Sequence, residues 1–162
     1  MNGAQLHLAF NHIPVIGMPG CFLLFAAALW RKSRDLAEAG FAALLLLALL
    51  SIAAFKTGGP AAHLIHTIPG ILRDQIHEHA EAADFGFWES EILGVLGLAG
   101  LWLMRGGKAA PRKLVVGAAA GALFVTTVFL RIAHLGGLIR HPEISSDFSP
   151  PPAPPEPGRP PK

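Results

Sequence analysis

The sequence predicts an all-α integral membrane protein, a bundle of four transmembrane helices, from three observations. Hydrophobic residues make up 52% of the 162-residue chain and charged residues only 15%, whereas about a quarter of the residues of a soluble domain are charged. The apolar residues gather in four long runs, each close to the roughly 20 residues that cross a bilayer as a helix. The charges lie in short clusters at the ends of these runs, as in membrane proteins. The lipid bilayer is therefore the expected partner, and nucleic acid is not.

The four predicted spans are 8–30, 37–55, 85–104 and 114–133. Backbone groups in lipid must form their hydrogen bonds within the spanning structure, so these runs are expected to be helices. No Lys or Arg precedes the first run, and a cleavable signal peptide needs a positive start. We therefore expect this run to remain as a mature helix.

The predicted connections between the spans are unequal. Two are short basic turns, at 31–35 and 105–113, and the third is a long loop, about 56–84. The long loop opens with TGGP at 57–60, which is typical of a helix stop and turn. Its second half, 71–84, lacks Gly and Pro and is expected to be a helix that can continue into the third span. The bundle is assigned to residues 1–148, and the Pro-rich tail, 149–162, is expected to be disordered.

The distribution of Lys and Arg predicts the orientation of the bundle. The two short turns carry seven of these residues, whereas the long loop carries two and the N-terminal segment none. Cytoplasmic loops are enriched in Lys and Arg. Both termini and the long loop are therefore expected to face the periplasm of a bacterial inner membrane, with the two turns in the cytoplasm.

All eight histidines fall on the predicted outer side of this topology: His7, His12, His63, His66, His77, His79, His134 and His141. Imidazole is a common ligand for transition metals and for haem iron, and ligands from separate helices can meet inside a bundle. The pattern predicts a haem b with His79 and either His12 or His141 as axial ligands, and a second haem would add His7 and His141. Alternatively, His12, His79 and His141 bind copper, zinc or iron without haem.

Small residues follow His79 along one face of the third span, at Ala83, Gly86, Ser90, Gly94 and Gly97. Such a stripe can form a slot beside a flat macrocycle, or it can allow two helices to pack closely. Both interpretations stay open at this stage.

Charged residues near the outer ends of the third and fourth spans suggest further roles. Glu89 and Glu91 are costly inside a span and usually serve a function or find a partner. Arg131 is a candidate ion-pair partner for one of them, and a proton route is the alternative. The Gly136-Gly137 pair predicts a break after the fourth span, and Arg140 beyond it suits a haem propionate or another carboxylate.

Four short motifs resemble a group of uncharacterised bacterial four-helix membrane proteins: LHLAFNHIP at 6–14, TGGPA at 57–61, His79 followed by EAA at 81–83, and GGLIRHPE at 136–143. More loosely, the chain is similar to domain-of-unknown-function family 2231, for which haem binding has been proposed. The likeness covers about residues 6–144. By motif position it implies importance for six residues: His7, Asn11, His12, His79, Arg140 and His141.

These observations predict a membrane subunit that binds haem b near the periplasmic face. It would pass electrons between a membrane or periplasmic redox protein and the quinone pool. A non-haem metal-binding membrane protein is the first alternative, and a structural or assembly subunit of a respiratory complex is the second. A redox or structural subunit is expected rather than a stand-alone enzyme.

Overall fold

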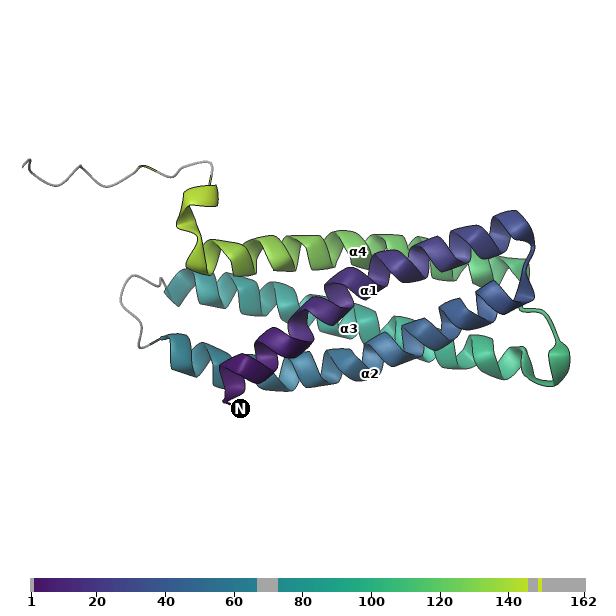
Figure 1. Cartoon of the computed structure of the whole chain (residues 1–162), viewed down its shortest axis with the longest axis horizontal. Coiled ribbons are helices and arrows are strands. Elements are labelled where there is room, and N and C mark those ends of the chain that lie inside the picture. Colours follow the sequence, from purple (N-terminus) through teal and green to yellow (C-terminus); the bar gives the residue numbers. More distant parts are fainter. Residues whose placement is uncertain (1, 67–72, 146–148, 150–162) are drawn as a thin grey trace, which may run out of the picture.

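The computed structural model describes residues 2–66, 73–145 and 149, and they form an all-α bundle of four long helices. The helices are α1 (Gly3–Arg31), α2 (Arg34–Ile65), α3 (Arg73–Leu103) and α4 (Arg112–Arg140), with short 3-10 turns at Arg105–Gly107 and Pro142–Ile144. Consecutive helices run in opposite directions, and α1 and α3 each pack mainly on α2 and α4 (Figure 1). The predicted four-helix fold is confirmed. The predicted tail, 149–162, lies outside the described residues except for Ser149.

Three of the helices, α1, α2 and α4, are long and apolar enough to cross a membrane. The predicted third span is part of α3, which is less apolar because it carries Glu89, Glu91 and repeated glycines. The continuous α3 confirms that the helical segment before residue 85 runs directly into this apolar part.

Each helix turns one side toward the core, and in α1 the buried residues recur at alternating intervals of four and three. In α1 the buried positions are Pro14, Met18, Cys21, Phe25 and Ala28. This spacing is that of left-handed helix packing, in which one face stays against its neighbours over many turns. The ring of Phe25 meets the ring of Phe41 edge to face, with centroids 5.0 Å apart, and both side chains are fully buried.

The predicted stop at 57–60 is wrong, because α2 continues through this segment to Ile65. Pro60 cannot donate a backbone hydrogen bond in the helix, but contacts from α1 hold this part of α2 in place. Gly3 packs so closely on Pro60 that a Cβ there would lie 2.7 Å from the Pro60 Cβ. The Thr57 hydroxyl donates to the carbonyl oxygens of Ala53 and Ala54 at 2.8 and 3.0 Å. Most of the predicted long loop is therefore helix, at the end of α2 and the start of α3.

The predicted break at Gly136-Gly137 is also wrong, because α4 continues to Arg140. Gly136 lies against the His79 ring, and a Cβ there would approach the ring Cε1 to 3.0 Å. The glycine therefore allows α3 and α4 to approach each other, and it does not end the helix.

The bundle has two different ends (Figure 1). The α1–α2 and α3–α4 connections form one, which we call the basic end because it contains the seven Lys and Arg residues of these turns. Arg34 joins the two connections there, since its guanidinium donates to the backbone carbonyls of Lys108 and Met104 at 3.0 and 3.3 Å. The opposite end contains the starts of α1 and α3 and the ends of α2 and α4, and we call it the histidine end.

Candidate functional site at the histidine end

The structure places all eight histidines at the histidine end, because each belongs to the outer turns of its helix or follows them. Five of the side chains are exposed and lie away from the bundle core: His12, His63, His66, His77 and His134. His141 caps α4 and is exposed as well. Only His7 and His79 are partly buried among these eight.

The His7 ring belongs to α1 and is held by α2. Its Nδ1 lies 3.0 Å from the Ala54 carbonyl oxygen and 3.3 Å from the Thr57 hydroxyl oxygen. A carbonyl oxygen can only accept, so Nδ1 carries the hydrogen and donates it. In the neutral ring Nε2 then has a free lone pair, which is the form that binds metals.

The His79 ring belongs to α3 and is held by α4 in the same manner. Its Nδ1 donates to the Ile132 carbonyl oxygen at 3.1 Å, and Gly136 lies beside the ring. Imidazoles that ligate a metal commonly donate their other N–H to a backbone carbonyl, which fixes the tautomer and the ring orientation. Both His7 and His79 have this arrangement.

A positive charge on His7 disfavours a second one on His79, although the two rings come from helices on opposite sides of the bundle. His79 precedes the predicted third span, and its pKa is lowered mainly by burial. The hydrogen bond to Ile132 opposes this shift, whereas the charge of His7 lowers the pKa further. The lowered pKa favours the neutral ring of His79, and because Nδ1 carries the hydrogen, Nε2 of that ring is unprotonated.

His12 and His141 do not join this pair. His12 Nδ1 donates to the Leu8 carbonyl of its own helix at 3.3 Å, and its side chain is exposed. His141 Nδ1 lies 2.9 Å from the Glu143 carboxylate, where both side chains are exposed. The hydrogen bond from the Glu143 backbone N–H and the one from His141 lower the pKa of this carboxyl. Within residues 2–66, 73–145 and 149, no three His, Cys, Asp or Glu side chains gather closely enough to hold a metal ion, so the predicted set of His12, His79 and His141 is not assembled there.

Several other residues singled out in the sequence have no hydrogen-bond or ion-pair partner among the residues that the structure describes. The side-chain oxygen of Asn11 is buried and has no hydrogen-bond partner among the described residues, and the same holds for one carboxylate oxygen of Glu91. Asn11 follows His7 by four residues and therefore shares its helix face. Arg140 is exposed at the end of α4. In the described part of the chain, Arg131 forms no ion pair with Glu89 or Glu91.

The glycine stripe of α3 is filled by the neighbouring helices. A Cβ at Gly86 would lie 2.5 Å from Ile132 of α4, and one at Gly97 would lie 2.7 Å from the backbone oxygen of Phe41 in α2. Ser90 forms a buried hydrogen bond with Ser51 of α2 at 3.1 Å. Close helix packing therefore explains the stripe, and the stripe offers no slot for a macrocycle.

The spacing of residues along α1 distinguishes His7, on the buried side of the helix, from His12, on the exposed side. His7 and Asn11 extend the buried stripe of α1 at the same intervals of four and three residues, and His12 lies off the stripe. In α3, His79 occupies the corresponding place on the stripe of Gly86 and Ser90. The contribution of Thr57 to the His7 site had no comparable signal, because it depends on how α1 and α2 pack.

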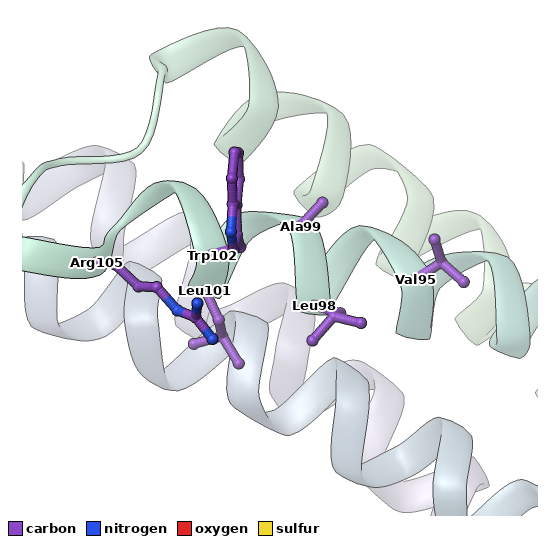
Figure 2. Close-up of a pocket in the computed structure, with 6 residues that line it drawn as sticks. All are labelled: Val95, Leu98, Ala99, Leu101, Trp102 and Arg105. Carbon is purple, nitrogen blue, oxygen red and sulfur yellow. The ribbon is translucent and has the colours of Figure 1, made fainter.

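A second type of surface lies far from the histidines. A groove of about 480 Å³ follows the outer side of α3 toward the basic end and is lined by Val95, Leu98, Ala99, Leu101, Trp102 and Arg105. Trp102 projects to one side of the helix, and Leu98, Leu101 and Arg105 project to the other (Figure 2). Its lining residues suit contact with acyl chains and include no metal ligand.

No protein-family model, curated protein or solved structure matches the chain.

Proposed function

We propose that this chain is a membrane subunit that binds haem b and transfers electrons, with His7 and His79 as the two axial ligands. The observation that carries the proposal is the pair of partly buried imidazoles, each held at Nδ1 by a carbonyl of a neighbouring helix. Bound haem would supply a one-electron Fe(III)/Fe(II) couple. The resemblance to family 2231, for which haem binding has been proposed, agrees with this choice.

The donor chemistry of the two rings fits a bis-imidazole site. The two histidines come from α1 and α3, and the neutral Nε2 of each ring would be the atom that binds the iron. The room for a macrocycle would have to lie at the level of the rings, because the glycine stripe below them is occupied. Asn11 lies one helical turn from His7, and its buried, unpaired oxygen is the nearest polar group of α1 to the proposed site. Arg140 is the proposed partner of a propionate.

A non-haem metal is the second candidate, and the filled glycine stripe favours it. A single copper, zinc or iron ion needs much less space than a macrocycle, and two imidazoles suit these ions. The same residues, His7 and His79, would then be the protein ligands. A structural subunit of a respiratory complex is the third candidate.

We further propose that α3 completes a set of four spans, with both termini on the periplasmic side of the bacterial inner membrane. The outer face of α3 carries exposed apolar side chains along its predicted span, at Phe85, Trp88, Ile92, Val95, Leu98 and Trp102. This stripe suits contact with lipid. Ser90 lies on the buried face, whereas Glu91 lies three residues after Trp88 and four before Val95 and so shares their side of the helix. The electron partner would be a membrane or periplasmic redox protein, or quinone.

The test is an absorption spectrum of the full-length protein purified in detergent, oxidised and reduced, together with metal quantification. The wild type is expected to show the spectrum of a bis-imidazole b-type haem at about one haem per chain. His7→Ala and His79→Ala are expected to lose it, whereas His63→Ala and His134→Ala, exposed histidines at the same end, are matched controls that retain it.

The alternatives give different results in the same experiment. A colourless protein with one copper, zinc or iron ion per chain, lost in His7→Ala and His79→Ala, would replace haem by a non-haem metal. If the folded wild type contains neither haem nor metal, and none of the four substitutions changes its spectrum or metal content, the structural role is the remaining candidate. Spectral loss in His12→Ala or His141→Ala, with His7→Ala unchanged, would reject the ligand pair.

A further inference from the structure

A groove of about 260 Å³ lies between α3 and α4 near the histidine end. It is lined by Glu78, Glu81, Ala82, Phe85, Val128 and Arg131. The groove therefore combines two carboxylates, one guanidinium and an apolar floor on the outer side of the bundle. Neither His7 nor His79 lines it, so it is separate from the proposed cofactor site.

The lining residues change from polar to apolar along the helix axis. The α3 helix starts at the histidine end, and Phe85 lies seven residues, roughly 10 Å, further into the bundle than Glu78. The α4 helix runs in the opposite direction, so Val128 lies about one turn deeper than Arg131. Contacts between Gly86 and Ile132 place Arg131 near the level of Ala82 and Phe85. From the water inward, the carboxylates come first, then Arg131 at about the level of Ala82 and Phe85, and Val128 lies deepest.

The charges in the groove do not neutralise one another. Glu81 is bound by His77, with Oε1 and Nε2 3.1 Å apart. Glu78 and Arg131 have neither an ion pair nor a hydrogen bond with any residue that the structure describes. The negative charge of Glu78 and the positive charge of Arg131 therefore line the same groove without forming an ion pair. A ligand with both charges could bind between them.

We propose that this groove binds the head group of an aminophospholipid of the phosphatidylethanolamine type. The ammonium group, which is the outer part of such a lipid, would bind Glu78 and Glu81. The phosphate would bind Arg131, because a guanidinium suits phosphate oxygens. An acyl chain would follow Ala82, Phe85 and Val128 into the bilayer. The order of charges in the groove matches the order of charges in the lipid, and the inference depends on the membrane location but not on haem.

The chemistry of the groove distinguishes this lipid from other phospholipids. A phosphatidylcholine head group has no N–H to donate to the carboxylates, so it would lose those hydrogen bonds. A phosphatidylglycerol head group has no cation to pair with Glu78 and Glu81. Its phosphate would bind Arg131 as in the other lipids, and only neutral hydroxyl groups would reach the two carboxylates. Both are therefore expected to bind more weakly than phosphatidylethanolamine.

The test is native mass spectrometry of the detergent-solubilised full chain, titrated with the three lipids carrying identical acyl chains. The wild type is expected to bind phosphatidylethanolamine about tenfold more tightly than the other two, as for one additional hydrogen bond to a charged group. Glu78→Gln is expected to remove the preference over phosphatidylcholine, and Arg131→Gln to weaken phosphatidylethanolamine and phosphatidylglycerol alike. Asp84→Asn and Lys56→Gln remove exposed charges outside the groove and are the controls.

Several results would overturn the proposal. Equal binding of the three lipids by the wild type would do so, as would equal effects of the groove and control substitutions. Weaker binding in Arg131→Gln with no change in Glu78→Gln would indicate a site for phosphate alone and reject the zwitterionic lipid. Circular dichroism of each variant verifies the fold, and haem or metal content, measured in parallel, keeps failure of this site separate from failure of the cofactor site.

Discussion

The basic end and the histidine end of the bundle differ in how far their polar groups are paired among the described residues. At the basic end Arg34 binds the carbonyls of Met104 and Lys108 and the carboxylate of Glu38, the last at 3.0 Å. The adjoining core is closely packed, with Phe25 and Phe41 fully buried. At the histidine end, partly buried imidazoles and the unpaired Asn11 oxygen occupy the continuation of the same core stripe. Buried polar groups without partners lower stability, so the second end is better suited to binding than to holding the bundle together.

The packed half of α3 gives the largest expected effect. Gly97→Ala would place a Cβ 2.7 Å from the Phe41 carbonyl oxygen and 3.0 Å from the Leu45 nitrogen, which are backbone atoms that cannot move aside. We expect a loss of about 2–3 kcal/mol, as for overpacking of a tight core. Thermal unfolding in detergent, followed by circular dichroism, measures it. Gly117→Ala is the control, because nothing lies within 4 Å of its Cβ; equal effects of the two substitutions would contradict close packing at Gly97.

At the histidine end, removal of a polar group is expected to stabilise the protein. Asn11→Leu eliminates the buried unpaired oxygen, and we expect a gain of about 1 kcal/mol, at the low end of the cost of such a group. The gain should be accompanied by a lower cofactor content, as measured by absorbance or metal analysis. His12→Leu, on the exposed side of the same turn, is expected to change neither quantity. A clear loss of stability in Asn11→Leu would instead assign Asn11 a structural role.

The smallest expected effect is a dependence of stability on pH through His79. Its folded-state pKa lies below the ordinary value of about 6.5, because burial disfavours the charged ring. The neutral ring therefore contributes stability that is present above the unfolded pKa and is lost as the pH falls through the folded one. The melting temperature of the cofactor-free wild type should decrease between about pH 7 and pH 5. His79→Gln does not titrate and should decrease less over this range; identical pH profiles would show that His79 does not contribute.

Part of the site could be predicted from the sequence and part could not. The topology places His79 and seven other histidines at one end, and the motif resemblance included His7 and Asn11. The preference for His12 and His141 as partners of His79 did not follow the helix faces, since His7 lies on the buried stripe and His12 lies off it. The hydrogen bonds from His7 to Ala54 and from His79 to Ile132 join residues 47 and 53 positions apart, and no local pattern reveals them.

Composition and periodicity alone determined that this chain forms a bundle of long apolar helices with its histidines at one end, because hydrophobic runs and charge clusters act locally along the chain. The tertiary structure decided where the helices end. TGGP at 57–60 and Gly136-Gly137 weaken a helix in isolation, but the contacts of Gly3 with Pro60 and of His79 with Gly136 hold both segments helical. The tertiary structure also decided the role of the α3 glycines, because atoms of the neighbouring α2 and α4 helices occupy the space beside them.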